Sequence, residues 1–338
     1  MTLSLPAEWP NGAARLQRLG RTVMDVILHL GAHRTATTTF QHYMRDQADA
    51  LSAQDIEFWG PRRSRDSVFP GLFRNSTAPR GRNVALRAVG RIRMFATQAR
   101  ARGVKQLLIS DENLLGNCIQ NIRAGRLYPA AGERTARISF AFGGRLRRIV
   151  LSIRSQDLWW ASACALTVSR GHPVPGAAQF DAILRARRTW RDVIMDLSCA
   201  APGAEIEVLA FETMQGQPEG ILRTALGIEA PKDCRGRWLN GSRDLPGLRA
   251  GLVDRGQNPD LLPEGTGRWM PFTSEQSAEL REQYADDLHW LIAGADGLAT
   301  LTEESHPTRA DPSLPMGAQT KGQMHDQGQF ERYMAQHR

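Results

Sequence analysis

The residues with the clearest potential for chemistry form a short polar turn over 31–38, which reads GAHRTATT. The turn follows the nearly continuous apolar run Val26–Leu30 and precedes a stretch with apolar residues at helical spacing. A strand, a tight turn and a helix in this order direct backbone N–H groups and the positive end of a helix dipole at one point. The sequence therefore predicts that this turn, called the cradle below, binds an anion such as a phosphate.

The cradle departs from the nucleoside-triphosphate pattern G-x-x-x-x-G-K-[ST]. Counted from Gly31, Ala36 stands at the second glycine position and Thr37 at the lysine position, while the basic residue comes earlier, at Arg34. A triphosphate loop with threonine in place of lysine lacks the side chain that reaches the β- and γ-phosphates. We therefore expect a ligand other than ATP or GTP.

Two further polar elements follow predicted buried strands. Glu112 lies just beyond the apolar run Leu107–Ser110, where a carboxylate can act as a general base. Arg154 ends the run Ile149–Ile153, and Ser162 comes eight residues later, about two turns into the next predicted helix. Because ligands of open parallel sheets gather at the carboxyl ends of the strands, we expect these groups to lie near the cradle.

Several neighbouring residues have alternative interpretations. Asp111 is suited to cap a helix, and His33 in the cradle is a rival general base. Trp159 and Trp160 would either stack on a ligand ring or pack in the core.

The segment from Leu28 to Gln41 resembles the 5′-phosphosulfate loop of sulfotransferases that use 3′-phosphoadenosine 5′-phosphosulfate (PAPS), and bacterial carbohydrate-type members resemble it most closely. The family pattern is a basic residue, Ser or Thr, a small residue and two Thr, after a buried strand. This chain has Arg34 where the family has Lys. Since 40 of its 43 basic residues are arginines, a bias in composition is sufficient to explain the exchange. Arginine is a planar fork and lysine a compact charge, so the exchange is compatible with a reduced rate.

The resemblance implies transfer of a sulfuryl group from PAPS to a hydroxyl or amine of a small-molecule or saccharide acceptor, with 3′,5′-ADP as product and without a metal. It implies that Glu112, in a Ser-x-Glu pattern, is the general base and that Arg34 neutralises the leaving phosphate oxygen. It also implies that Arg154 and Ser162 bind the 3′-phosphate of PAPS. The residues implied to bind its 5′-phosphosulfate are His33, Arg34, Thr35, Ala36, Thr37 and Thr38.

Two other classes of function are open, and the balance of charge bears on one of them. The formal net charge of +8 favours anionic partners, but no run of five basic residues occurs, so nucleic acid is not an expected partner. An ATP-dependent small-molecule kinase would require ATP and Mg²⁺. A non-catalytic binder of nucleic acid or of an acidic polymer would show a steep dependence on salt.

The remaining sequence supplies the elements that position these groups. Short apolar runs alternate with longer helical stretches, which predicts an α/β fold, a three-layer parallel sheet flanked by helices. The resemblance adds a P-loop-NTPase-like sulfotransferase fold. The predicted strands are 26–30, 56–59, 107–110, 149–153 and 206–211. The predicted helices are 40–51, 84–102, a single amphipathic helix over 180–197, and one that a capping box at Thr273 and Gln276 opens, whereas 61–83 is a predicted loop.

The predicted organisation is an N-terminal extension over 1–22, a sulfotransferase-like domain over 23–300 and a flexible polar tail over 301–338. A weaker similarity to the family is an Asn-x-Ser stretch at 240–243, whose Arg243 is a further candidate ligand of the 3′-phosphate.

The sequence also bears on the cellular compartment. It has no run of 18 apolar residues, which predicts no membrane span. Its four cysteines are far apart, and polar residues interrupt any N-terminal apolar region, so we expect reduced thiols and a cytoplasmic protein. Met24, directly before the first strand, is an alternative start.

Overall fold

The computed structural model describes residues 24–73, 81–214, 217–230 and 241–302. All of these residues fall within one compact unit. The predicted extension over 1–22 and the predicted tail beyond residue 302 lie outside the described residues, as does Asn240.

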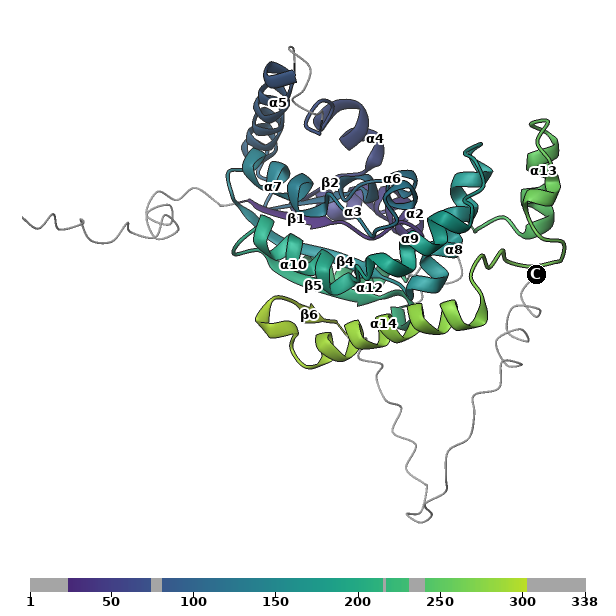
Figure 1. Cartoon of the computed structure of the whole chain (residues 1–338). Helices are drawn as coiled ribbons and strands as arrows, with labels where there is room; N and C mark the ends of the chain where they lie inside the picture. The colour runs from purple at the N-terminus through teal and green to yellow at the C-terminus, as the bar shows by residue number, and fades with distance from the viewer. Residues whose placement is uncertain (1–23, 74–80, 215–216, 231–240, 303–338) are drawn as a thin grey trace, which may run out of the picture. The chain divides into compact units, whose positions relative to one another are not determined.

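The described chain folds around a six-stranded sheet in which every strand pairing is parallel (Figure 1). The strand order is β2-β3-β1-β4-β5-β6. This arrangement confirms the predicted α/β class with a parallel sheet. The strands are β1 Asp25–His29, β2 Ile56–Trp59, β3 Gln106–Ser110, β4 Leu146–Ile153, β5 Glu205–Ala210 and the short, unpredicted β6 Thr300–Leu301.

Helices cover both faces of the sheet (Figure 1). They are α2 Thr37–Asp46, α3 Ala48–Ser52, α4 Pro61–Arg63, α5 Gly81–Ala101, α6 Cys118–Ala124, α7 Ala131–Ala141, α8 Gln156–Ser169, α9 Ala177–Ala186, α10 Trp190–Ala200, α11 Phe211–Met214, α12 Pro218–Leu226, α13 Leu245–Val253 and α14 Ser274–Ile292. Shorter turns are the π-helical η1 Ser64–Val68 and the 3₁₀ turns η2 Glu112–Leu114, η3 Pro259–Leu261 and η4 Ala295–Gly297.

Alternate side chains of the strands face opposite layers, as the pleat of a strand requires. Ile27, Leu108 and Val150 belong to one apolar core, which they share with side chains of α2, α3 and α12. Val26 and Leu28 belong to a second core with α5, α7, α8, α10 and α14. The sheet is therefore the middle of three layers, which explains why its strands read as continuous apolar runs.

The order of the strands places the predicted site at the carboxyl ends of neighbouring inner strands. β1 lies between β3 and β4, so the three strands that precede the candidate residues are neighbours. After β1 the chain builds β2 and β3 on one side and then crosses to β4 on the other. Such a reversal leaves a crevice beyond the carboxyl ends of the strands, which is where open α/β sheets bind ligands.

The predicted single helix over 180–197 is wrong, because the structure contains two helices there. α9 ends at Ala186, and Arg187 adopts a left-handed conformation with φ of 47°. α10 then begins after Thr189, whose backbone N–H donates to Asp192 Oδ2 at 2.8 Å. The apolar spacing was compatible with one helix, but the cap and the left-handed residue separate it into two.

The predicted loop over 61–83 is also partly wrong, because α4 and η1 occupy residues 61–68 and α5 begins at Gly81. The predicted capping box at the start of α14 is confirmed, since Thr273 and Gln276 cap each other.

Within the described ranges, no helix is both long enough and apolar enough to cross a membrane.

Candidate active site

The cradle joins β1 to α2 and has the backbone shape of an anion-binding loop. Arg34 and Ala36 both adopt left-handed conformations, with φ of 69° and 60°, on either side of Thr35. Left-handed residues in such a turn aim successive N–H groups into a concavity that favours anions. Ala36 is also the N-cap residue of α2 and offers no side-chain cap to the helix start, so the positive end of the helix faces the same concavity.

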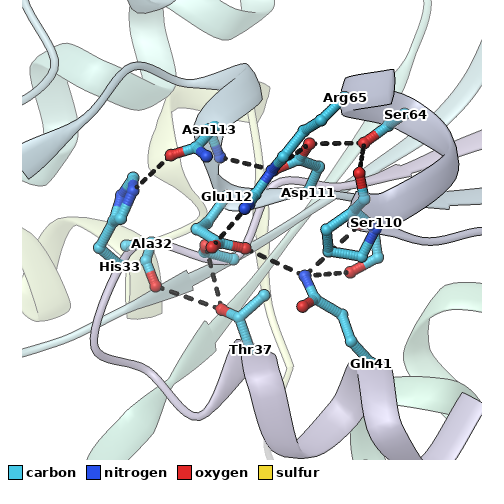
Figure 2. A network of polar contacts seen from close by, with 12 residues as sticks. Ala32, His33, Thr37, Gln41, Ser64, Arg65, Ser110, Asp111, Glu112 and Asn113 are labelled. Atoms are coloured by element: carbon cyan, nitrogen blue, oxygen red, sulfur yellow. Dashed lines mark hydrogen bonds and ion pairs between the residues drawn. The ribbon is translucent and has the colours of Figure 1, made fainter. Parts of the chain in front are cut away.

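Hydroxyl groups of the cradle hold its shape from within. Thr35 Oγ1 donates to the carbonyl of Ala32 at 2.6 Å, and Thr37 Oγ1 donates to the carbonyl of Gly31 at 3.2 Å. Thr37 Oγ1 also lies 3.4 Å from the carbonyl oxygen of Ala32 (Figure 2). These two threonines were predicted to contact the 5′-phosphosulfate, and the structure places their hydroxyls in the loop's own hydrogen bonds. Thr38, predicted to do the same, lies in the first turn of α2 and is half-buried.

A fully buried histidine forms the floor of the cradle. His29 Nδ1 lies 2.8 Å from Ser110 Oγ, while His29 Nε2 has no hydrogen-bond partner among the described residues. A Cβ atom on Gly31 would lie 2.7 Å from Nε2, so a larger residue at position 31 would force this buried ring or the loop to shift. Burial lowers the pKa of His29 to about 4, against a smaller opposing effect of Glu112, so the ring is neutral at neutral pH. His29 has no role among the sequence predictions, although a polar residue inside an apolar strand was a signal.

The side chain of Arg34 extends away from the cradle towards α8. Its Nε donates to Ser162 Oγ at 2.8 Å, and its Nη2 donates to Ser242 Oγ at 2.7 Å. The two serine hydroxyls are themselves 2.7 Å apart. Arg154 Nη1 donates to the carbonyl of Arg34 at 3.0 Å. The structure thus brings Arg34, Arg154 and Ser162 together as predicted, but the Arg34 guanidinium lies at the predicted 3′-phosphate site.

These groups belong to a cluster of positive charge, which we call the arginine cluster: Arg34, Arg154, Arg170 and Arg268, with Ser162 and Ser242. Burial, and to a smaller extent the charges of Arg268 and Arg34, lower the pKa of Arg154 to about 10. Burial, Arg170 and Arg268 also lower the pKa of Arg34. Glu212 and Asp157 oppose the shift at Arg154. Like charges gathered in a partly buried site favour the binding of an anion.

One atom of the cluster supports this conclusion independently. Arg154 Nε is buried and has no hydrogen-bond partner in the described structure. The rest of its guanidinium lies over the ring of Phe211, 4.8 Å from the ring centre. A buried donor without an acceptor costs about 1–3 kcal/mol, which an anionic ligand would recover.

Glu112 begins η2, shortly after the end of β3. β3 lies on one side of β1, whereas β4, which leads to Arg154, lies on the other. The carboxylate of Glu112 accepts a hydrogen bond from Gln41 Nε2 at 3.0 Å and one from Arg65 Nη2 at 2.9 Å (Figure 2). Burial raises the pKa of Glu112, but His33, Arg65 and the Gln41 hydrogen bond outweigh it, and the pKa lies below its ordinary value. Glu112 is therefore ionised at neutral pH, as a general base must be.

Asp111 has the structural role that the sequence offered as an alternative. Its carboxylate caps η2 by accepting from the backbone N–H of Asn113. It also accepts from Ser64 Oγ at 2.5 Å and from two nitrogens of Arg65. A carboxylate with these contacts is fully occupied and leaves the base role to Glu112.

His33 has partners at both ring nitrogens. Its Nδ1 lies 2.8 Å from Tyr128 Oη, which also accepts from the backbone N–H of His33. Its Nε2 lies 3.0 Å from the side chain of Asn113 (Figure 2). Burial is the largest influence and lowers the pKa of His33. With both nitrogens engaged, His33 links the cradle to its surroundings and is a poorer candidate than Glu112 for the base.

The two tryptophans between Arg154 and Ser162 pack in the core. Trp159 and Trp160 are almost completely buried and contact each other edge to face. Trp159 also contacts Tyr128 and Trp190, so neither tryptophan is placed to stack on a ligand.

Gln41, Arg65, Tyr128 and Ser242 were not predicted as site residues. Gln41 belongs to the segment that resembles the sulfotransferase loop, and Ser242 belongs to the Asn-x-Ser stretch, but neither pattern indicated a contact. In that stretch Ser242, rather than the suggested Arg243, contacts Ser162 and Arg34.

Comparison with protein-family models, with curated proteins and with solved structures found no match for this chain. A function for this chain is therefore inferred from its residues and their geometry. Across the described part of the chain, no group of three or more His, Cys, Asp and Glu side chains is arranged to hold a metal ion.

Proposed function

We propose that this protein transfers a sulfuryl group from PAPS to a hydroxyl or amine of an acceptor such as a small molecule or a saccharide. The observation that carries the proposal is the position of Arg34. Its backbone belongs to the cradle, while its side chain belongs to the arginine cluster. Two anion-binding sites therefore adjoin, which suits a nucleotide with phosphate groups at both its 5′ and 3′ positions.

The proposed reaction uses the ionised carboxylate of Glu112. It takes the proton of the acceptor hydroxyl as the acceptor oxygen forms a bond to sulfur. The bond between sulfur and the bridging phosphate oxygen breaks, and 3′,5′-ADP leaves. Backbone N–H groups of the cradle and the start of α2 stabilise the charge that develops on the leaving phosphate.

The arginine cluster has a separate task in this proposal. Arg154, Ser162 and Ser242 bind the 3′-phosphate, which distinguishes PAPS from ATP. Arg34 can reach the bridging oxygen only if its guanidinium leaves the two serines. A 3′-phosphate competes for these hydroxyls, so we expect Arg34 to move when the nucleotide binds. We further propose that the protein belongs to the P-loop-like sulfotransferase family and that it is cytoplasmic.

A thermal-shift measurement with 3′,5′-ADP, ATP and 5′-AMP tests the proposal. A ligand at 100 times its dissociation constant adds about 2.7 kcal/mol to the free energy of unfolding, which raises the melting temperature by several degrees. We expect this rise with 3′,5′-ADP and a smaller one with 5′-AMP.

The other outcomes separate the alternatives. A rise with ATP alone, increased by Mg²⁺, would favour a small-molecule kinase. No rise with any of the three nucleotides would contradict the proposal and leave a binder of another anion, whose affinity for a polyanion such as heparin would fall steeply with salt.

A further inference from the structure

The carboxylate of Glu112 is held between two elements that are far apart in the sequence. Gln41 reaches it from α2, and Arg65 reaches it from the π-helical turn η1. Arg65 Nη2 lies 2.9 Å from Glu112 Oε1 and 2.6 Å from Asp111 Oδ1, so one nitrogen bridges two neighbouring carboxylates (Figure 2). Without this bridge the two acids would repel each other at the end of β3.

The turn that carries Arg65 is fixed against β3. Ser64 and Arg65 are consecutive residues, and both bind the buried carboxylate of Asp111. A π-helical turn is an uncommon conformation that occurs frequently at functional sites. Here it directs the side chains of Ser64 and Arg65 at the carboxylate of Asp111, and Arg65 Nη2 also reaches Glu112.

Asn113 connects Arg65 to the cradle. One side of its amide faces His33 Nε2 at 3.0 Å, and the other side faces the Arg65 guanidinium. The amide orientation that satisfies both neighbours donates to His33 and accepts from two Arg65 nitrogens at 3.0 and 3.1 Å. His33 is anchored in turn by Tyr128. A continuous set of hydrogen bonds thus leads from the cradle to the carboxylate.

We propose that Arg65 is a positioning residue that holds Glu112 in the orientation for proton abstraction, and that Asn113 ties this arginine to His33 of the cradle. The catalytic meaning of this inference rests on the proposed function, whereas the contact itself does not. Arg65 touches no reacting atom and acts through Glu112. Among the described residues, Glu112 interacts electrostatically with His29, His33, Arg65, Cys118 and Tyr128, and it shares Arg65 with Asp111.

The experiment is a ¹³C NMR titration of the Glu112 carboxyl group in the full chain, with the signal assigned by its loss in Glu112→Gln. In Arg65→Met the carboxylate loses its nearest positive charge. We expect the titration midpoint to move upward by about 1–3 pH units. The matched control is Arg63→Met, because Arg63 is similarly exposed and binds Glu57 rather than Glu112. The midpoint should not change in that control.

A second readout is the pH dependence of sulfuryl transfer. Turnover falls as pH drops through the pKa of the base, so Arg65→Met should move the acidic limb of the profile to higher pH and Arg63→Met should not. An unchanged midpoint and an unchanged limb in Arg65→Met would overturn the inference while leaving the proposed function intact. If no variant transfers a sulfuryl group, the proposed function fails, and the NMR titration still decides whether Arg65 holds Glu112.

Removing Arg65 leaves Asp111 as a buried, unpaired charge, which can prevent folding. The comparison is then repeated in an Asp111→Asn background, with and without Arg65→Met. Asn at 111 still offers an oxygen to cap η2, and the buried charge is absent from both proteins. An upward midpoint upon adding Arg65→Met supports the inference, and no movement overturns it.

Discussion

The cradle and the arginine cluster adjoin, but the anion binding proposed for each depends on a different part of the chain. The cradle depends on backbone shape, since left-handed residues and the start of α2 orient its N–H groups. The arginine cluster depends on side chains, namely guanidinium groups and two serine hydroxyls. The cradle should therefore respond to substitutions that change its backbone conformation or the room around it. The arginine cluster should respond to substitutions that change its charge.

The largest expected effect lies in neither region. Replacing Glu112 with Gln keeps the hydrogen bond to Arg65 but removes the base, and general-base catalysis contributes about 10²–10⁴ in rate. We expect turnover to fall by that factor while the affinity for 3′,5′-ADP, measured by calorimetry, stays within about twofold. Retained turnover in Glu112→Gln would remove this residue from the mechanism.

The next prediction tests the arginine cluster. Arg154→Met removes a charged donor, and hydrogen bonds to charged groups contribute about 1.5–3 kcal/mol. We expect the affinity for 3′,5′-ADP to fall about 10- to 100-fold, with a much smaller change for 5′-AMP. Arg148→Met is the control, because Arg148 lies on β4, the strand that Arg154 follows, but binds Glu205. Equal losses for both nucleotides in Arg154→Met would show that the two regions are not separate sites.

The smallest effect is expected in the cradle. Ala36 is left-handed, which costs an L-residue other than glycine about 1–2 kcal/mol. Ala36→Gly should therefore raise the free energy of unfolding by about 1 kcal/mol in chemical denaturation, without changing nucleotide affinity. Ala285→Gly, on the exposed face of α14, should lower it by about 0.5–1 kcal/mol. A loss of stability in Ala36→Gly would contradict the proposed strain.

The sequence predictions are correct mainly where a feature depends on residues that are close together in the chain. The strand positions, the Thr273 capping box and the cap formed by Asp111 depend on neighbouring residues, and the structure agrees with all three. The separation of Arg154 and Ser162 also places both near Arg34, because β4 and α8 are consecutive.

Contacts between distant segments could not be predicted in the same way. The direction of the Arg34 side chain depends on its φ and on Ser242, which belongs to a different part of the chain. Arg65 lies in a segment whose composition predicted only a loop, and its role depends on two carboxylates at the end of another strand. Periodicity and spacing carry no information about such pairs.

The hydrogen bond between Arg34 and Ser242 joins residues 208 positions apart. Contacts of such long sequence separation are expected to form late, because closing a long loop costs entropy before the contact can repay it. The hydrogen bonds of Thr35 and Thr37 inside the cradle, by contrast, join residues three to six positions apart. We therefore expect these internal hydrogen bonds of the cradle to form before the contact with Ser242. The proposed selection of a 3′-phosphorylated nucleotide should then appear only once Ser242 has reached Arg34.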